Sequence, residues 1–304
     1  MQKNWKRKLA LLVTSVMVVG SSYVMAEGTA KDPYSEDFSS FVTEDVAPVT
    51  SAVKFNNCYP ETDISHFTPV KGLATKDKSD TAIMINSKEA DYSAYVNEDG
   101  SFSKAGLNHP NVDVMVNSGD FNSGEKIHIS FEMINFDYNI RKYVTMKVKS
   151  QHQDGTVEDT HFPHKGGEFV SMNVVNGKPQ ICFFGSSYAN YQYNLGEWYK
   201  IDIFFDKDLQ TNPKVAGTEL YAANANMYIN GKLVYKDYGY NPASGDINAL
   251  DNSVLKSIES IRFQQQPVKL TGNTYCSGSF AFDNIYAGIV NESTMPVLTE
   301  TPMP

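Results

Sequence analysis

A strict alternation of apolar and polar residues recurs along this chain and limits the folds that it can adopt. In residues 126–136, for example, Ile127 and Ile129 alternate with His128 and Ser130. Successive side chains of a β-strand point to opposite faces, so such a segment buries one face and keeps the other polar. The same period of two recurs in residues 112–116, 143–149 and 198–205. The pattern predicts β-strands that are buried on one face.

Two Asn-Gly pairs separate strand patterns in the way that tight hairpins require. Asn176-Gly177 stands between residues 169–175 and 180–184, and Asn230-Gly231 stands between two further short strand patterns. Both central positions of the usual two-residue turn need a positive φ, which Asn and Gly tolerate best. After residue 26 the chain has 24 Asn and only 10 Leu, a composition that disfavours helical bundles, coiled coils and Leu-rich repeats. We therefore predict an all-β chain of about ten to twelve short strands, folded as an antiparallel β-sandwich.

The ends of the chain differ from its interior. Residues 1–26 combine a basic start, an apolar run from Leu9 to about Gly20 and a small residue at Ala26, which is the pattern of a cleaved secretory signal peptide. The apolar run is shorter than the roughly 20 residues that a membrane span needs, so stable membrane insertion is not expected. Residues 27–33 are predicted to be a flexible lead and residues 291–304 a Pro/Thr-rich tail or linker. The organisation thus predicts one sandwich domain over residues 34–290 of a protein that is secreted, extracellular or at the cell surface.

Charge and cysteine content constrain the partners and the chemistry. The net charge of the chain is −9, and loss of the four basic residues of the leader would take it to −13. An acidic protein lacks the basic footprint that nucleic acid requires, so no nucleic-acid partner is expected. Cys182 has the setting of a buried small hydrophobic residue on a strand, whereas Cys58 and Cys276 flank turn-like sequence and could pair with each other.

Four segments in the second half of the chain carry a more specific resemblance. They are residues 196–206 (GEWYKIDIFFD), 227–234 (MYINGKLV), 261–263 (IRF) and 278–286 (GSFAFDNIY). Their order resembles the concanavalin A-like (laminin-G-like) lectin/glucanase superfamily, which is found in many secreted bacterial proteins that act on polysaccharides. The resemblance covers roughly residues 120–290, with residues 34–119 expected to supply the first strands. It implies a lectin-like jelly-roll sandwich, but these motifs are architectural and do not identify an activity.

Aromatic clusters suggest where a glycan could bind. Sugar rings stack on flat aromatic faces while neighbouring polar groups bond their hydroxyls. We therefore predict glycan-binding residues in the tyrosine-rich segment before residue 199 and on the strand pattern that begins at residue 141. These residues are Tyr188, Tyr191, Tyr193, Trp198, Lys147 and Arg141. The alternative is that the aromatic residues only pack in the core and along the sheet edges.

Two enzymatic interpretations remain open beside a non-catalytic one. The Glu-x-Asp-x-x-Glu pattern of glucanases with this fold is absent, and Glu132 and Asp137 fall on opposite faces of a strand, which argues against a hydrolase. A polysaccharide lyase needs a base such as Tyr or His and a group that neutralises a uronate. Tyr143, Arg141 and Lys147, with Lys149, His161 and His164 nearby, could supply such a set. We expect a non-catalytic carbohydrate-binding or cell-surface recognition module, with a lyase as the first alternative and an adhesive domain with a protein ligand as another.

The resemblance also implies a structural calcium site. The segments that contain Glu36 and Asp37 at one end of the domain and Asp283 at the other are similar to paired terminal segments that hold Ca²⁺ in related sandwich modules. Carboxylate and carbonyl oxygens suit this ion. The alternative is that Asp37 and Asp283 only cap turns.

Overall fold

The computed structural model describes a large part of the predicted domain as strands. The described residues are 34–39, 53–56, 67–73, 80–86, 111–122, 124–138, 141–151, 154–162, 169–175, 177–183, 191–206, 225–238, 254–266, 268–269, 275–276 and 278–290. All of them belong to one compact unit that spans residues 31–304. They include no helix, and hence no helix that could cross a membrane. The predicted leader, lead and tail lie outside the described residues.

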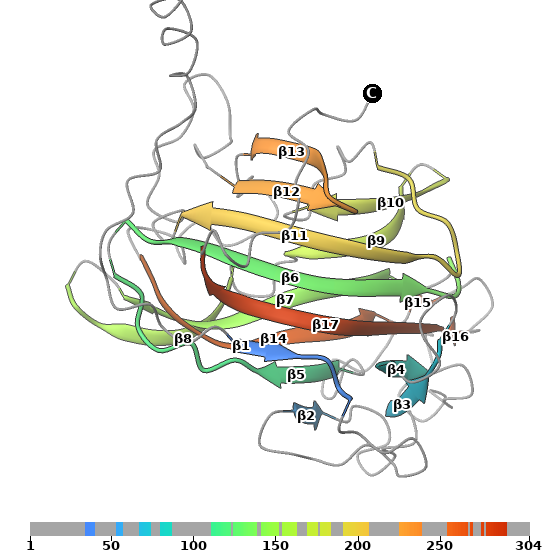
Figure 1. Ribbon diagram of the computed structural model, residues 1–304, viewed down its shortest axis with the longest axis horizontal. Helices are drawn as coiled ribbons and strands as arrows, with labels where there is room; N and C mark the ends of the chain where they lie inside the picture. Colours follow the sequence, from blue (N-terminus) through green and yellow to red (C-terminus); the bar gives the residue numbers. More distant parts are fainter. Residues whose placement is uncertain are drawn as a thin grey trace, which may run out of the picture. The chain divides into compact units, whose positions relative to one another are not determined.

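One layer is an eight-stranded antiparallel sheet (Figure 1). Its strands, in spatial order, are β13 (Lys232–Tyr238), β12 (Ala225–Ile229), β11 (Trp198–Asp206), β6 (Lys126–Asn135), β17 (Ser279–Ile289), β4 (Thr81–Asn86) and β3 (Phe67–Lys71). β1 (Tyr34–Glu36) also pairs with β17, further along that strand than β4 does.

The second layer is a seven-stranded antiparallel sheet. Its strands, in spatial order, are β10 (Lys178–Phe183), β9 (Val170–Val175), β7 (Arg141–Gln151), β14 (Val254–Gln266), β5 (Asn111–Met115) and β2 (Val53–Asn56). β8 (Val157–Phe162) pairs with the second half of β7, beyond the part that pairs with β9. A separate short pair joins β15 (Val268–Lys269) to β16 (Tyr275–Cys276).

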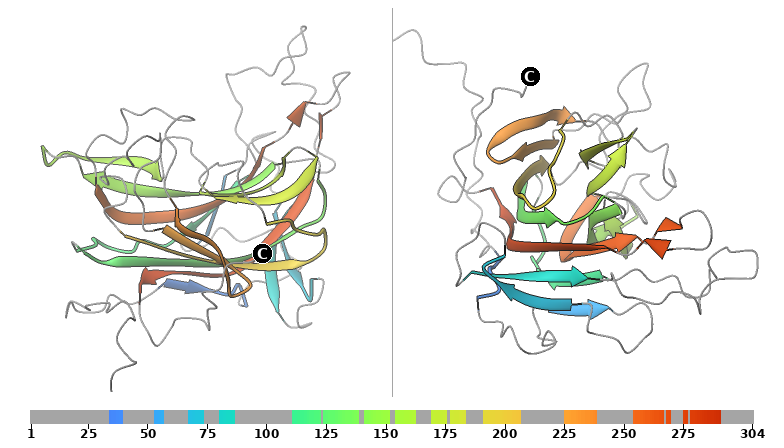
Figure 2. Two further views of the ribbon diagram at one scale, coloured as in Figure 1. Left: turned by 90° about the horizontal axis from the view of Figure 1, so that it is seen from above. Right: turned by 90° about the vertical axis from the view of Figure 1, so that its right-hand side faces the viewer.

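The chain crosses repeatedly between the two sheets. β4 and β6 belong to the eight-stranded sheet, whereas β5 and β7, which follow each of them in sequence, belong to the seven-stranded sheet. Strands that are neighbours in a sheet are therefore often distant in sequence, as β6 and β17 are. The views from above and from the side show the two sheets as stacked layers (Figure 2). This arrangement is the antiparallel jelly-roll β-sandwich that the sequence predicts.

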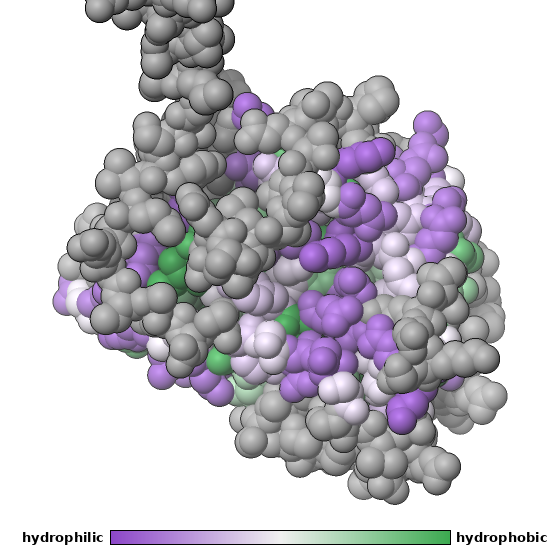
Figure 3. Space-filling view, viewed as in Figure 1, coloured by the Kyte–Doolittle hydropathy of each residue, from purple (hydrophilic) through white to green (hydrophobic). Residues whose placement is uncertain are grey.

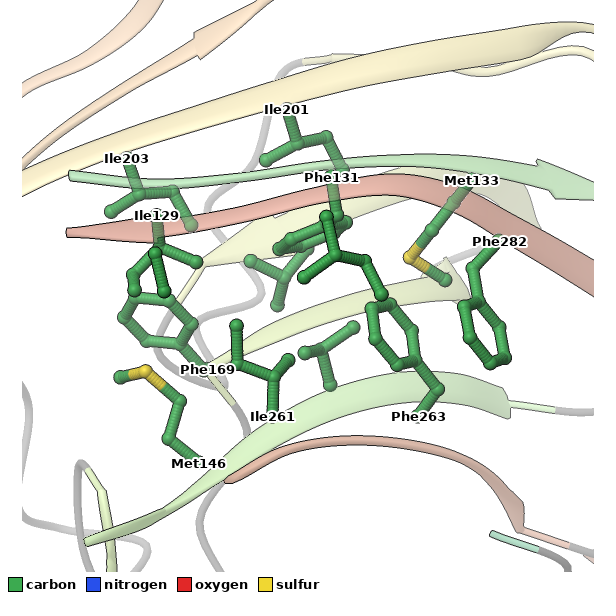
Figure 4. Packing of buried hydrophobic residues seen from close by; sticks show 14 of the residues in the cluster. Ile129, Phe131, Met133, Met146, Phe169, Ile201, Ile203, Ile261, Phe263 and Phe282 are labelled. Carbon is green, nitrogen blue, oxygen red and sulfur yellow. The ribbon is translucent and has the colours of Figure 1, made fainter. Parts of the chain in front are cut away.

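The core lies between the two sheets and contains the apolar residues of the alternating pattern. Ile129 and Phe131 of β6 and Ile201 of β11 point toward Ile261 and Phe263 of β14 (Figure 4). The rings of Phe263 and Phe282 stack across the layers, with centroids 3.9 Å apart and planes 5° from parallel. A further ring, that of Phe131, meets Phe263 edge-on. The predicted division into a buried and a polar face is therefore confirmed for these strands.

The strands on either side of each Asn-Gly pair form the predicted hairpins. Val175 pairs with Lys178 across the first turn, and Ile229 pairs with Lys232 across the second. Asn230 and Gly231 adopt φ values of 50° and 76°, as a two-residue turn of this type requires. The buried thiol predicted on a strand is also confirmed, since Cys182 lies in β10 and is almost fully covered. Cys58 lies outside the described residues, so its predicted pairing stays a prediction.

Candidate functional site

The outer face of the seven-stranded sheet carries a continuous set of polar side chains. Val144 and Met146 of β7 and Ile261 of β14 point into the core, so the residues between them point outward. We call this set of side chains the polar face, of which Lys147 and Arg262 are the more exposed members and the others are buried. It is made up of Asn111, Asp113, Tyr143, Thr145, Lys147, Ser171, Ser260, Arg262 and Gln264.

The strand register arranges the polar face in rows. Tyr143 lies opposite Gln264 of β14 on one side and opposite Ser171 of β9 on the other. Gln264 in turn lies opposite Asn111 of β5. Directly opposed side chains in antiparallel strands have Cβ atoms about 5 Å apart, so this row presents a phenol, an amide and a second amide side by side.

The next row contains a charge cluster. Asp113 of β5 accepts two hydrogen bonds from Arg262, from Nε at 2.6 Å and from a terminal nitrogen at 2.9 Å. Its second oxygen also accepts a hydrogen bond from Lys147 Nζ at 2.8 Å. Burial by itself would raise the pKa of Asp113, which is 2% exposed, but the hydrogen bonds and charges of Arg262 and Lys147 outweigh it and hold the pKa below its usual range.

The charge cluster leaves a local excess of positive charge. Two cations share one carboxylate, and the side chain of Lys147 remains 31% exposed. The bidentate contact fixes the plane of the Arg262 guanidinium, whereas Lys147 behaves as a more mobile point charge. In an otherwise acidic protein, this position can attract a carboxylate or donate hydrogen bonds to a polar ligand.

Several hydroxyl groups on the polar face are buried without a hydrogen-bond partner. They are the side-chain hydroxyls of Thr145, Ser171 and Ser260, and the side-chain oxygen of Gln180 at the β10 edge shares this property. Buried polar atoms are usually paired with protein or ordered water, because an unpaired one costs about 1–3 kcal/mol. The polar face therefore has unused capacity for hydrogen bonds within the part of the chain that the structure describes.

The predicted aromatic residues do not form one exposed platform. Tyr193 is 1% exposed and its hydroxyl accepts a hydrogen bond from Asn135 Nδ2 at 2.9 Å, so its ring presents no face to a sugar. Burial raises the pKa of Tyr193. The half-buried Tyr191 packs against the core and meets the ring of Tyr199 edge-on. Tyr191 and Tyr193 pack with the core because the segment before β11 folds against the sandwich.

Trp198 lies on a different surface from these tyrosines. It is half-buried on the outer face of the eight-stranded sheet, packed near Ala82 and Ile134, and its Nε1–H donates to the carbonyl oxygen of Leu73 at 3.0 Å. Tyr188 lies outside the described residues. Of the predicted cluster, Tyr191 and Tyr193 therefore pack with the core, whereas Trp198 lies on the outer face of the other sheet.

The two basic residues predicted to bind glycan, Lys147 and Arg141, both belong to β7. Lys147 lies on the polar face, in contact with Asp113. Arg141 begins β7, at the register position opposite Gln266 of β14, but its side chain is outside the described part of the structure. Arg262, Asp113 and Gln264 were not identified as site residues from the sequence. The sequence did indicate that these three residues stand at polar positions of alternating strands. It does not show which strands are neighbours, so it could not show that their side chains meet.

The residues predicted to hold calcium lie where the first strand meets the last. Glu36 of β1 pairs with Ile285 of β17, two residues after Asp283. Glu36 Oε1 accepts the backbone N–H of Phe38 at 2.8 Å, and Asp37 Oδ1 accepts that of Ser39 at 3.0 Å. This second bond lowers the pKa of Asp37.

These side chains also have partners within the protein. Asp283 is fully buried, and one of its oxygens accepts the N–H of Asn284. Among the described residues, no three His, Cys, Asp or Glu side chains come close enough together to hold an ion. The observed contacts are those of side chains that stabilise turns.

Comparison with known proteins gives structural likeness only. No family model and no curated protein matches the chain. A GH131 β-glucanase catalytic domain from Podospora anserina is 7% identical over 78% of this chain and 85% of that one, with a TM-score of 0.42. A family 7 alginate lyase is 12% identical over 79% and 95%, with a TM-score of 0.39. The cellulose-induced protein Cip1 is 10% identical over 89% and 100%, with a TM-score of 0.38. These values are too low for any of the named activities to be carried over to this chain.

Proposed function

We propose that this protein binds a polysaccharide on the polar face of its seven-stranded sheet. The observation that carries the proposal is the cluster of Asp113, Arg262 and Lys147 beside the row of Tyr143 and Gln264. The ammonium of Lys147 and the guanidinium of Arg262 are the more exposed groups of this face, and both can donate hydrogen bonds to the hydroxyl or carboxylate groups of a sugar.

Binding to soluble polysaccharides tests this proposal. The full protein would be titrated with a neutral β-glucan and with alginate in an isothermal calorimeter, beside a Lys147→Gln variant. Lys147→Gln leaves Asp113 paired with Arg262, so the fold is expected to persist while the exposed cation is lost. We expect about a tenfold loss of affinity for an acidic polysaccharide, which is the loss of one charge-assisted contact worth about 1.4 kcal/mol.

A matched control separates a local contact from a general charge effect. Lys236 is an exposed lysine on β13 of the other sheet, and Lys236→Gln removes the same charge. Its affinity is expected to equal that of the unaltered protein. Equal weakening by both variants, or no binding of either polysaccharide, would contradict the proposed use of the polar face.

Lyase activity is a second candidate function because a phenol, an amide and a guanidinium are neighbours on the polar face. Tyr143 lies opposite Gln264 and diagonal to Arg262. A phenol can act as the base, and an amide or guanidinium can stabilise the charge that develops on a uronate. Lyase action leaves an unsaturated chain end that absorbs ultraviolet light. Growth of this absorbance with alginate, and its loss in Tyr143→Phe, would establish the enzyme, whereas binding without it would establish a recognition module.

Export is part of the same proposal. We infer it from the leader pattern of residues 1–26, which ends at Ala26. Expression of the full chain in a bacterial host, followed by N-terminal sequencing of the protein outside the cytoplasm, is expected to show Glu27 as the first residue. Recovery of uncleaved protein from the membrane fraction would contradict this.

We also propose that the segment of Glu36 and Asp37 binds a structural Ca²⁺ ion. Glu36 and Asp37 would need backbone carbonyls and water as further ligands, because no third side chain of a suitable kind joins them among the described residues. A stabilising ion would raise the melting temperature, since it binds only the folded state. Equal melting temperatures in excess Ca²⁺ and in EDTA would show that these carboxylates serve the turn alone.

A further inference from the structure

A second polar hollow lies on the opposite layer, on the outer face of the eight-stranded sheet. Hydrophilic side chains gather over β11, β6 and β17 in the space-filling view (Figure 3). A cavity of about 290 Å³ opens there, lined by His128, Ser130, Glu132, Lys200, Asp202, Asn284 and Tyr286. None of these residues belongs to the polar face, so the hollow is independent of the function proposed above.

The strand register explains why there is a hollow. Ser130 of β6 lies opposite Asp202 of β11 on one side and opposite Tyr286 of β17 on the other. Ser130 has a short side chain, and larger side chains stand on every side of it. Along β6 these are His128 and Glu132, which precede and follow it on the same face. The floor of the cavity is therefore polar and its walls are taller than its centre.

A buried histidine–aspartate pair forms one wall. His128 Nε2 lies 3.0 Å from Asp202 Oδ1, and the two side chains are 3% and 1% exposed. The imidazole stacks on the ring of Phe204, with centroids 4.3 Å apart, and tilts against the ring of Tyr286 at 4.9 Å. The imidazole of His128 is thus in contact with two aromatic rings.

The pair also has two buried atoms without partners. They are His128 Nδ1 and Asp202 Oδ2. If Nε2 carries the proton that is shared with Asp202, Nδ1 is an acceptor, and a carboxylate oxygen is an acceptor as well. A buried acceptor without a donor costs free energy. A ligand that donates hydrogen bonds to these two atoms would therefore be stabilised.

The other groups of the cavity narrow the class of ligand. Glu132 and Asp202 disfavour an anion, and Lys200 in the same wall disfavours a cation. No group of three metal-binding side chains exists among the described residues, which disfavours a metal ion. The volume exceeds that of a single water, whose share of liquid volume is about 30 Å³. What fits is a neutral molecule rich in hydroxyl groups, with an apolar face for Tyr286.

We propose that this hollow is a second binding site, for a single neutral sugar residue such as a hexose at a glycan end. The sugar hydroxyls donate to His128 Nδ1 and Asp202 Oδ2 and accept from Lys200. The ring of Tyr286 covers part of the apolar face of the sugar. A protein with this site and the polar face binds glycans on both of its layers.

Saturation-transfer NMR on the full protein tests this site with defined probes, the methyl glycosides of glucose, galactose and mannose. Two variants address it. Asn284→Gly removes the amide that donates to Glu132 at 3.1 Å and keeps the positive φ of 50° at this position. Ser130→Leu fills the floor of the cavity. We expect transfer to at least one glycoside and at least a tenfold loss of affinity in both variants.

Two controls make the outcome decisive. Asn117→Gly is the same substitution at an exposed residue with φ of 47°, away from the hollow, and is expected to bind as the unaltered protein does. Lys236→Gln alters an exposed lysine of β13 that does not line the hollow, and it is also expected to leave the glycoside signal unchanged. Melting curves check that each variant is folded. Absence of transfer from all three glycosides, retention of binding by both site variants, or loss of the signal in Lys236→Gln would each overturn the second site.

Discussion

Single residues on the outer faces carry most of the chemistry that this protein can offer. Asp113 organises two cations on the seven-stranded sheet, and His128 and Asp202 form a buried pair on the eight-stranded sheet. All of these stand at polar positions of alternating strands, so their outward direction was predictable. Their partners were not, because Asp113 and Arg262 are far apart in sequence and meet only through the pairing of β5 with β14.

Asp113 is expected to dominate the acid sensitivity of the polar face. Asp113→Asn should lower the free energy of unfolding at neutral pH by about 3 kcal/mol, because it leaves two cations without their buried counter-charge. The folded pKa of Asp113 lies below its unfolded value of about 3.9, so its contribution is present above about pH 4 and is lost as the pH falls through the folded pKa. Urea unfolding at several pH values should therefore show the difference between the two proteins shrinking in acid.

The exposed Asp159 of β8 provides the control for this experiment. Asp159→Asn changes the same functional group, and it is expected to alter stability by less than about 0.5 kcal/mol at any pH. A constant difference between Asp113→Asn and the unaltered protein from neutral to acid pH would show that Asp113 is not the titrating group.

At the scale of elements, the strands and hairpins were the most predictable features. Apolar and polar alternation located β6, β7 and β11, and the Asn-Gly pairs located both two-residue hairpins. The short strands β1, β2 and β3 were not predicted individually, because three to five residues carry too little periodicity. Contacts between elements, such as the hydrogen bond between Asn230 and β11, also cannot be predicted from a local sequence pattern.

The β12–β13 turn tests two roles of one asparagine. Asn230 holds φ of 50°, and its Oδ1 accepts the backbone N–H of Lys200 at 2.9 Å. Asn230→Gly should lose only this hydrogen bond, about 0.5–1.5 kcal/mol. Asn230→Ala should lose the bond and also be strained by about 1–2 kcal/mol, because a residue with a Cβ resists a positive φ. Urea unfolding should rank the three proteins in that order, and equal stabilities of the two variants would contradict the backbone argument.

A buried lysine ties the ends of three strands together. Lys142 of β7 donates from Nζ to the carbonyl oxygen of Asp137 at 2.9 Å and also contacts its carboxylate. The second carboxylate oxygen of Asp137 accepts the N–H of Ser279, at the start of β17, at 2.7 Å. A Cβ on the adjacent Gly278 would lie 2.5 Å from this carboxylate, so the three strand ends meet without spare room.

Lys142→Ala is therefore expected to be strongly destabilising. It leaves the carboxylate of Asp137 in a mostly buried position without its cation, which typically costs about 3–5 kcal/mol. Lys149→Ala, at an exposed position of the same strand, should change the free energy of unfolding by less than about 0.5 kcal/mol. Similar melting temperatures of the two variants would show that the Lys142 contact is not needed to hold the strand ends.

The whole molecule depends on the packing between its two sheets. The stacked rings of Phe263 and Phe282 come from different layers and are fully buried. Neither ring could be assigned its partner from the sequence, because the strands that carry them never pair. Alternation predicted that both point inward, and the crossover topology decided that they meet.

Phe263→Ala should therefore weaken the sandwich as a whole. Loss of a buried aromatic side chain costs about 3–5 kcal/mol when the surroundings cannot collapse into the cavity. Calorimetric melting beside Val174→Ala, a more exposed apolar position on β9, would measure the effect, with little change expected in the control. A loss below about 1 kcal/mol for Phe263→Ala would mean that the two layers repack around the gap.

The sequence by itself determined the class of structure, because the period of two, the Asn-Gly turns and the scarcity of Leu are local properties that only a strand-and-turn protein satisfies. It also placed Lys147 on an outward face. Only the tertiary structure decided which outward residues become neighbours, since Arg262 reaches Asp113, and His128 reaches Asp202, through strands distant in sequence. Likewise, local pattern could not show that Tyr193 is buried while Trp198 lies on the other sheet, because burial depends on what the rest of the chain packs against it.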